Sequence, residues 1–348
     1  MNRQLLVEFT EGEVKLALDQ MAPLRAPSLD GMPPFFYQHY WDLVGKEITT
    51  FVLSFLNLAT LPEHLNHTCI TLIPKIKNPE HVSEFHPISI CNVWYKIFSK
   101  VLANRLKNVL PQIITEHQSA FTKDRLISNN ILLAFESLHC MNKHKSVKGG
   151  FMALKLDMSK AYNRVEWPFL ECIMRKMGFD ERWITLMMLC VSTVSYSIPI
   201  NGVPNGFIRP TRGIRQGDPL SPFLFLLCIE GLHGLISQSA LRGDIHGFSL
   251  SKRSPPLTHL LFADDSLLFC RSNEDECRKI IEILHIYERS SSQQINKDKT
   301  TLFFSKSTSE EEKLLIKDTL DVEIRHYETY LGLPSLVGKN KKASFNSI

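Results

Sequence analysis

The sequence lacks the features that mark several large classes of protein. Its eight cysteines include no C-x-x-C pair, which excludes a zinc ribbon or a disulfide scaffold and suits a reducing compartment. Its longest apolar stretch, PFLFLLCIEGLHGLI, is interrupted by Glu230 and His233 well short of a membrane span, so it predicts a buried helix. Glu8 precedes any apolar core of signal-peptide length, so secretion is not indicated.

What is present is an ordinary globular composition. The chain has 348 residues, 44% of them hydrophobic and 22% charged, which is enough for a sizeable core and for two or three subdomains. The net charge of +4 is mild. A predicted amphipathic helix carries the basic side chains Lys96, Lys100, Arg105 and Lys107. Together they could bind along a phosphate backbone, although each of them alone is more typical of a solvated helix face.

Helices and short strands alternate along the chain. Thr10 and Glu13 predict a capping box, and the stretch 35–59 predicts one helix. Further helices are expected at 94–110, 128–142 and 273–290, and strands at 69–74, 151–157 and 300–305. The succession of strand, helix, hairpin, helix and strand is typical of a split β-α-β sheet with helices on one face.

Two aspartates stand in the middle of the apolar run HLLFADDSLLFC. The pattern predicts strand, turn, strand, with Asp264 and Asp265 near the tip of the hairpin. Asp157 also follows an apolar strand, and if the two strands are neighbours the carboxylates converge and require a cation between them. Oxygen ligands favour Mg²⁺ or Mn²⁺. Only one of Asp264 and Asp265 is expected to share the site directly. A polar Asp-Asp turn without metal is the commoner explanation of an isolated ADD.

Five separated motifs give the sequence a family resemblance. The segments LDMSKAY, RGIRQGDPLSP, FADD, QQINKDKT and YLGLP occur in the order and at the spacings of the palm motifs of reverse transcriptases. The upstream segment 71–106 resembles the fingers motifs of plant non-LTR (LINE-type) retrotransposons. The resemblance implies an α/β (α+β) right-hand polymerase fold with fingers, a palm with an antiparallel sheet, and a thumb that is largely missing.

The same resemblance implies a domain division and an activity. Residues 1–56 would form a helical extension, 57–335 the reverse transcriptase domain (fingers about 57–150, palm about 151–335), and 336–348 a truncated tail.

The activity implied by the resemblance would be RNA-directed DNA polymerisation with two Mg²⁺ ions, for which Mn²⁺ can substitute. Asp157 and Asp264 would be the metal ligands and Asp265 a neighbouring carboxylate. The partners would be an RNA template, a DNA primer and deoxynucleoside triphosphates in the nucleus, with no membrane, and no protein partner is indicated.

The resemblance also implies a nucleotide-binding set. Tyr162 matches the residue that rejects a 2′-hydroxyl, although plain core packing would equally explain it. Gln216 and Gly217 match a loop at the template and nucleotide, although a turn before a helix also uses glycine. Lys75 and His86 match positions near the triphosphate, and Lys299 matches a lysine suggested as the proton donor to pyrophosphate. Either lysine could instead be an exposed, solvated side chain.

Several positions depart from the family pattern. His86 replaces a common arginine, Asn163 replaces an aspartate, Lys123-Asp124 replaces a Pro-Gly turn, and Ser292 replaces a glycine. These departures, and the expected lack of an endonuclease and a thumb, leave a second possibility: a catalytically weak or inactive retrotransposon remnant that retains only nucleic-acid binding. A third, a maturase-like splicing factor, would need a C-terminal RNA-binding region.

Overall fold

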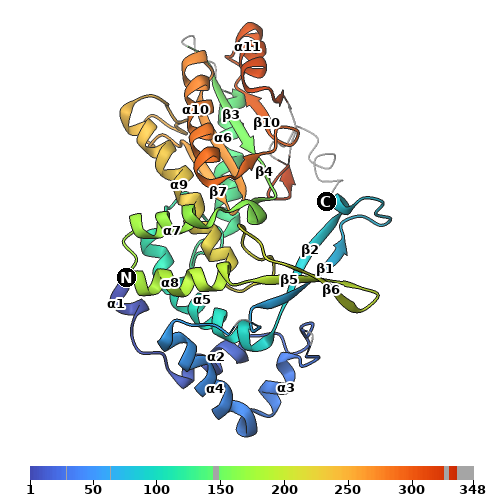
Figure 1. Ribbon diagram of the computed structural model, residues 1–348. Helices are drawn as coiled ribbons and strands as arrows, with labels where there is room; N and C mark the ends of the chain where they lie inside the picture. Colours follow the sequence, from blue (N-terminus) through green and yellow to red (C-terminus); the bar gives the residue numbers. More distant parts are fainter. Residues whose placement is uncertain (29, 63, 144–148, 325–328, 335–348) are drawn as a thin grey trace. The chain divides into compact units, whose positions relative to one another are not determined.

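The protein folds into two compact units that are both discontinuous in sequence. The computed structural model describes residues 1–28, 30–62, 64–143, 149–324 and 329–334 (Figure 1). Unit 1 comprises Met1–Ile113 and Tyr162–Leu227, and unit 2 comprises Ile114–Ala161 and the chain from Cys228 onward. The expected mixed α/β fold is confirmed. The fingers and palm division stays a prediction, and the predicted tail 336–348 lies outside the described residues.

The long helix α5 (Val93–Ile113) of unit 1 is largely buried and packs against several other helices of the unit. The predicted capping box is confirmed at the start of α2 (Glu11–Asp19), where Thr10 and Glu13 cap each other. Glu13 also binds Arg105 of α5, with Nε and Oε1 2.6 Å apart. The remaining helices are α1 (Asn2–Leu5), α3 (Pro34–His39), α4 (Trp41–Leu58), the 3-10 turns η1 (Val82–Glu84) and η2 (Ala161–Arg164), α7 (Trp167–Lys176) and α8 (Glu181–Ser192).

Two expectations about these helices are wrong. The stretch 35–59 is not one helix, because Tyr40 leaves helical geometry (φ −100°, ψ 25°) between α3 and α4. Its ring packs at this bend against Phe36, with ring centroids 5.2 Å apart. The proposed basic face of α5 is also incomplete, because Lys96 is 2% exposed and Arg105 8% exposed, so neither can track a phosphate backbone.

Unit 1 contains a four-stranded sheet with the order β2-β1-β5-β6. β1 (His67–Pro74) pairs antiparallel with β2 (Phe85–Cys91) and parallel with β5 (Ser195–Ile200). A hairpin follows α8, since β5 pairs antiparallel with β6 (Val203–Ile208). All residues of β6 are exposed, so β6 is a solvent-exposed edge strand and adds nothing to a hydrophobic core.

Unit 2 is built on a five-stranded sheet with the order β11-β10-β3-β8-β7. β3 (Phe151–Leu156) pairs antiparallel with β8 (Asp265–Arg271) and β10 (Thr301–Phe304). β8 pairs antiparallel with β7 (His259–Phe262), whereas β10 and β11 (Glu323–Ile324) are parallel. The unit also contains two short antiparallel pairs: β4 (Met158–Ser159) with β9 (Gln294–Ile295), and β12 (Thr329–Tyr330) with β13 (Leu333–Pro334).

Helices cover both faces of this sheet, so the expectation of helices on one face is wrong. On one face, α6 (Ile127–Lys143) packs its Ala134, Leu138 and Met141 against Ala153 and Phe269. On the other face lie α10 (Glu274–Ser291) and α11 (Glu310–Leu320). Alternate residues of β3 serve the two faces, since Ala153 points to α6 and Leu154 to α10.

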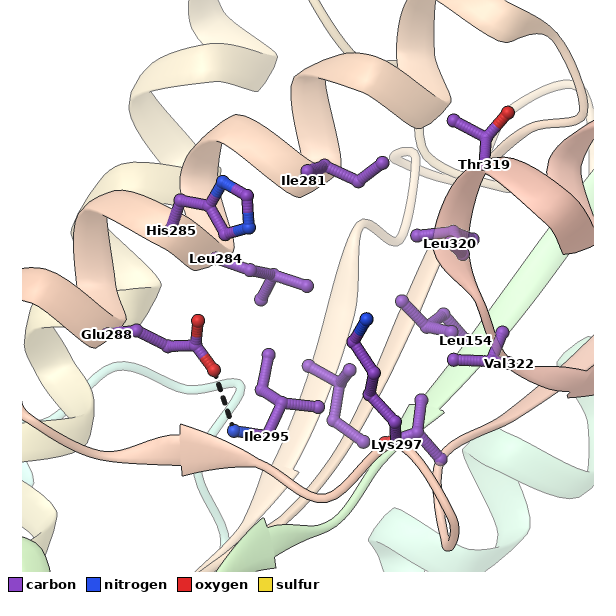
Figure 2. Close-up of a pocket in the computed structure, with 12 residues that line it drawn as sticks. Leu154, Ile281, Leu284, His285, Glu288, Ile295, Lys297, Thr319, Leu320 and Val322 are labelled. Carbon is purple, nitrogen blue, oxygen red and sulfur yellow. Dashed lines mark hydrogen bonds between the residues drawn. The ribbon is translucent and has the colours of Figure 1, made fainter.

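A cavity of about 220 Å³ lies between β3, α10 and α11. Figure 2 shows Leu154, Leu284 and Leu320 facing it, with Lys297 crossing its mouth. The Glu288 carboxylate closes one side by accepting a 2.8 Å hydrogen bond from the backbone nitrogen of Ile295 (Figure 2). The lining is mainly aliphatic, so the hollow belongs to the hydrophobic layer between sheet and helices.

The apolar stretch after residue 220 forms α9 (Ser221–Arg242), which continues from unit 1 into unit 2. In the described part of the chain it is the one helix long and apolar enough to cross a membrane, and half of its most apolar window is buried. Residues 224–229 are at most 1% exposed, which confirms a buried helix there. Core helices of soluble proteins meet the same criteria of length and composition.

Candidate active site

Strand register brings three carboxylates to one edge of the unit 2 sheet. Leu156 at the end of β3 lies opposite Ser266 of β8, so Asp157 follows β3 beside the start of β8. Phe262 of β7 lies opposite Asp265 of β8, which leaves Ala263 and Asp264 as a two-residue turn. The expected hairpin, with Asp264 at its tip and Asp157 on the neighbouring strand, is therefore present.

The turn that carries Asp264 contains a residue in the left-handed backbone conformation, which is unfavourable for residues other than glycine. Ala263 has φ +52°, and a left-handed residue of this kind costs about 1 to 2 kcal/mol. Gln118, fully buried, offsets this cost because its Oε1 accepts hydrogen bonds from the backbone nitrogens of Ala263 (3.1 Å) and Ala120 (2.9 Å). Sequence reasoning missed Gln118, since a single glutamine in HQSAF carries no motif that identifies it.

Asp157 is held through its backbone by the segment after α10. Its carbonyl oxygen accepts a hydrogen bond of 2.8 Å from the backbone nitrogen of Asn296. Its own nitrogen lies 3.5 Å from Thr300 Oγ1, and the next residue, Met158, pairs with Ile295. The QQINKDKT motif thus fixes the direction of the chain at Asp157.

The carboxylates of this edge influence one another. Partial burial raises the pKa of Asp264, and the neighbouring Asp157 carboxylate raises it further. Burial and then Asp264 likewise raise the pKa of Asp265. Each carboxyl therefore makes it harder for its neighbour to carry charge, as expected for like charges that share a small region.

Lys299 lies close enough to compensate part of this charge. Lys299 Nζ is 3.9 Å from Asp157 Oδ2, but the lysine side chain is 69% exposed, so the pair contributes little stability. Lys155 of β3 acts in the same direction, since it lowers the pKa of Asp265. Three carboxylates and two ammonium groups still leave an excess of negative charge, with carboxylate oxygens as the donors. This donor set fits a hard divalent cation such as Mg²⁺ or Mn²⁺.

In unit 1, strand register places Lys75 and His86 on one face of the β1–β2 hairpin. His86 lies opposite Ile73, and the Lys75 backbone nitrogen donates a 2.8 Å hydrogen bond to Glu84 O, so the two side chains are diagonal neighbours. Both are exposed. Lys75 Nζ donates to Ser83 O at 2.8 Å, which ties this lysine to its own hairpin.

The loop of Gln216 and Gly217 lies against β2. Ser89 N donates a 3.0 Å hydrogen bond to Gln216 O. Gly217 has φ +102°, and a Cβ at this position would lie 3.0 Å from Ser89 O. Glycine is therefore required here both by the conformation and by the close approach of two backbones.

A buried ion pair holds this loop, and sequence reasoning missed it. Arg215 Nη2 lies 2.7 Å from Asp218 Oδ2, and both side chains are at most 3% exposed. Tyr95 Oη donates to the same carboxylate at 2.6 Å, and the Arg215 guanidinium lies 4.0 Å from the Tyr95 ring centroid. Nothing in the RGIRQGDP motif distinguishes this buried arginine from the exposed Arg212.

Tyr162 packs its ring on Phe225, with centroids 5.1 Å apart and planes 7° apart. Its carbonyl accepts a 2.9 Å hydrogen bond from the Ile214 nitrogen, which joins it to the loop of Gln216. The side chain is half-buried, so one side of the ring serves packing. Unit 1 thus carries Lys75, His86, Tyr162, Gln216 and Gly217, whereas unit 2 carries the carboxylates and Lys299.

Comparison with known proteins agrees with the chemistry of this edge. The sequence matches the reverse transcriptase (RNA-dependent DNA polymerase) family over residues 73–334. The chain belongs to this family. It is 27% identical over 298 residues to the transposon TX1 uncharacterized 149 kDa protein of Xenopus laevis, covering 86% of this chain and 22% of that protein.

Two further relatives extend the comparison. The chain is 26% identical over 235 residues (67% of this chain, 22% of the relative) to the retrovirus-related Pol polyprotein from the type-1 retrotransposable element R2 of Nasonia vitripennis. It is 54% identical over 67 residues (19% of this chain, 55% of the relative) to an uncharacterized mitochondrial protein of Arabidopsis thaliana.

The chain spans between about a fifth and just over half the length of these relatives. The predicted class, a reverse transcriptase domain of the non-LTR retrotransposon type and an RNA-directed DNA polymerase by resemblance, is confirmed. Divalent metals and a nucleic-acid template and primer are general requirements of this family.

Proposed function

We propose that this chain copies RNA into DNA by two-metal nucleotidyl transfer at Asp157 and Asp264, with Asp265 as a supporting carboxylate. One observation carries the proposal: the β3–β8 register and the two-residue turn bring these side chains to one sheet edge. Burial and then the neighbouring carboxylates raise the pKa values of Asp264 and Asp265, which supports the proposal because a bound cation would favour the charged form of both groups.

Each residue takes the role that the family resemblance implies for it. Bound Mg²⁺, or Mn²⁺ in its place, would supply the charge that activates the primer 3′-hydroxyl and stabilises the leaving pyrophosphate. Asp157 and Asp264 hold the cations, and the Asn296 hydrogen bond keeps Asp157 in place. Lys299, 3.9 Å from Asp157, donates a proton to pyrophosphate. Lys75 and His86 contact the triphosphate, the Tyr162 ring rejects a 2′-hydroxyl, and Gln216 and Gly217 abut the template and nucleotide.

The substrates follow from the family and from these roles. The template is RNA, the primer is DNA, and the monomers are deoxynucleoside triphosphates. In this proposal residues 57–150 act as fingers and 151–335 as palm, and the chain works in the nucleus. The five palm motifs and the family match over 73–334 support this proposal.

A primer-extension assay on an RNA template, in Mg²⁺ and then in Mn²⁺, tests the proposal. Asp264→Asn keeps the size of the side chain but removes its charge, and we expect extension to fall at least about a thousandfold because transition-state charge is no longer neutralised. Asp265→Asn should leave measurable extension. Asp318→Asn, on the exposed surface of α11, is the matched control and should extend like the wild type.

Two outcomes would contradict the proposal. Equal extension by the wild type and Asp264→Asn would show that the carboxylates do not hold the catalytic cations. An absence of extension in both metals, with salt-sensitive binding of the primer-template still present, would favour the alternative of a remnant that retains only nucleic-acid binding.

A further inference from the structure

Three histidines from separate segments meet inside unit 2. His117 belongs to the loop before α6, His233 lies on α9, and His259 is the first residue of β7. One ring nitrogen of each lies within 4.8 Å of one ring nitrogen of each of the others. His233 Nδ1 and His259 Nε2 are hydrogen-bonded at 2.9 Å. Nothing in the carboxylate chemistry of this unit uses these side chains.

The spacing is close to that of a tetrahedral metal site. With metal–nitrogen bonds of about 2.0 to 2.1 Å, two nitrogen ligands of Zn²⁺ lie roughly 3.3 Å apart. The observed separations of 2.9 Å and at most 4.8 Å bracket this value. Small rotations of the rings would therefore bring three nitrogens onto one ion, and the fourth position would remain for water.

The hydrogen bonds around the rings orient them as metal-binding histidines are oriented. His259 Nδ1 lies 2.8 Å from Thr258 Oγ1, and His117 Nδ1 lies 3.0 Å from Thr115 Oγ1. A hydroxyl partner on Nδ1 fixes the ring and leaves the lone pair of Nε2 for a metal. For both residues the hydroxyl group is supplied by a threonine one or two positions earlier in the chain.

The three rings lie partly or fully out of contact with solvent, since His259 is fully buried and His117 and His233 are half-buried. Glu230, half-buried on the same helix as His233, accepts a 3.0 Å hydrogen bond from Thr115 N.

We propose that His117, His233 and His259 bind one divalent transition-metal ion of the Zn²⁺ class at the base of the β7–β8 hairpin. This site is separate from the carboxylates, because His259 begins β7 whereas Asp264 follows its end, about 15 Å further along an extended chain. Three imidazole nitrogens select Zn²⁺, Ni²⁺ or Co²⁺, whereas the all-oxygen carboxylate edge selects Mg²⁺ or Mn²⁺.

The bound ion would stabilise the turn that carries Asp264. The carbonyl of His117 accepts a 2.8 Å hydrogen bond from Leu261 N of β7. The next residue, Gln118, binds Ala263 N in the turn at 3.1 Å. A metal that ties His117 to His233 and His259 would thus fix the same segment that holds the turn, so its role is structural rather than catalytic.

Metal binding by the purified full chain tests the proposal. The chain is freed of metal with a chelator, returned to buffer with millimolar Mg²⁺ to occupy the carboxylates, and titrated with Zn²⁺ and with Co²⁺. We expect one tightly held Zn²⁺ per chain after dialysis, an absorption band of nitrogen-bound tetrahedral Co²⁺, and a rise in unfolding temperature with Zn²⁺. His233→Ala should weaken Zn²⁺ binding at least about a hundredfold.

Matched variants separate this site from other ligands. His285→Ala, on α10 beside the aliphatic cavity, removes a histidine outside the cluster and should bind Zn²⁺ like the wild type. Asp264→Asn should also keep the ion, which separates this proposal from the polymerase proposal. Loss of the bound ion in Cys172→Ser, which removes an exposed thiol, would overturn the proposal.

A second measurement needs no variant. Diethyl pyrocarbonate modifies accessible neutral histidines, and Zn²⁺ should protect the half-buried His117 and His233 but not His285 in the wild-type chain, as read by peptide mass spectrometry. The absence of retained Zn²⁺, equal retention by wild type and folded His233→Ala, or equal modification with and without Zn²⁺ would each overturn the proposal.

Discussion

The two units position their candidate residues in different ways. In unit 2, Asp157 and Asp264 each lie within two residues of a paired strand position, so the strand register is the main determinant of where they meet. In unit 1, Tyr162 and Gln216 are joined through loop hydrogen bonds to Ile214 and Ser89. Their positions depend on the buried pair of Arg215 and Asp218.

This difference has a physical consequence. A strand register changes only if a whole ladder of hydrogen bonds shifts, so the carboxylate edge should tolerate single changes around it. A loop held by one buried ion pair is destabilised as soon as either partner of that pair is replaced. The loop of unit 1 should therefore be the more fragile part of the candidate site.

The largest expected effect is loss of stability on removal of Arg215. Arg215→Met leaves the Asp218 carboxylate buried without its cation and removes the hydrogen bond to Asn66 Oδ1 at 2.5 Å, so we expect a cost of about 3 to 5 kcal/mol in the free energy of unfolding. Arg212→Met breaks an exposed pair with Glu166 (3.3 Å) and should cost at most about 1 kcal/mol. Urea unfolding measures both, and equal losses would contradict the assignment of fragility to the buried pair.

The next effect concerns the pH dependence of stability in unit 2. Burial raises the pKa of Glu230 to about 7, while the Thr115 amide and Arg125 act in the opposite direction. Because the folded pKa exceeds the unfolded value, the stabilising contribution is complete below pH ~4.5 and is lost as the pH rises through about 7. Glu230→Gln should therefore be more stable than wild type by roughly 2 to 3 kcal/mol at pH 8, with little difference at pH 4.

Glu136→Gln is the control for this pH dependence. Glu136 is exposed on α6 of the same unit, so its replacement should give no pH-dependent difference in urea unfolding. A Glu230→Gln variant that is less stable than wild type at pH 8 would show that the ionised carboxylate is needed at this position, through its contact with Thr115 N.

A smaller effect is expected at His86, where the resemblance implies an arginine. An arginine offers a permanent charge and a planar fork for phosphate oxygens, whereas a neutral imidazole offers one donor. Since a charge-assisted hydrogen bond contributes about 1.5 to 3 kcal/mol, His86→Arg should lower the KM for deoxynucleotide at least about tenfold and leave the metal requirement unchanged. His64→Arg, exposed in the same unit, adds the same charge elsewhere and should not change KM. Equal KM values for the wild type and His86→Arg would mean that this position does not reach the triphosphate.

Sequence alone predicted the parts of the fold that depend on local periodicity. The apolar runs on both sides of Asp264 and before Asp157 predict their strands, and the β3–β8 pairing confirms their neighbourhood. The features that the sequence did not predict depend on contacts between segments that are distant in the chain. Lys96 and Arg105 look like a basic helix face, but tertiary packing buries both.

Gln118 and the three histidines illustrate the same limit. Gln118 supports a turn 145 residues away, and His117, His233 and His259 come from a loop, a helix and a strand. No spacing within one segment can reveal such a cluster. The break at Tyr40 between α3 and α4 depends likewise on how aromatic rings pack, which periodicity does not describe.

The smallest expected effect tests whether the departures from the family pattern carry a conformational cost. Ser292 ends α10 with φ +55°, and Asp124 has φ +64° in the loop before α6, so both stand where glycine is favoured. The Ser292 nitrogen already donates to Glu288 O at 2.8 Å, and glycine would keep this bond while removing the Cβ strain. Ser292→Gly should raise the free energy of unfolding by up to about 1 kcal/mol. Ser290→Gly, inside the same helix, should lower it by about 0.5 to 1 kcal/mol, and changes of the same sign in urea unfolding would show that the helix end is not strained at Ser292.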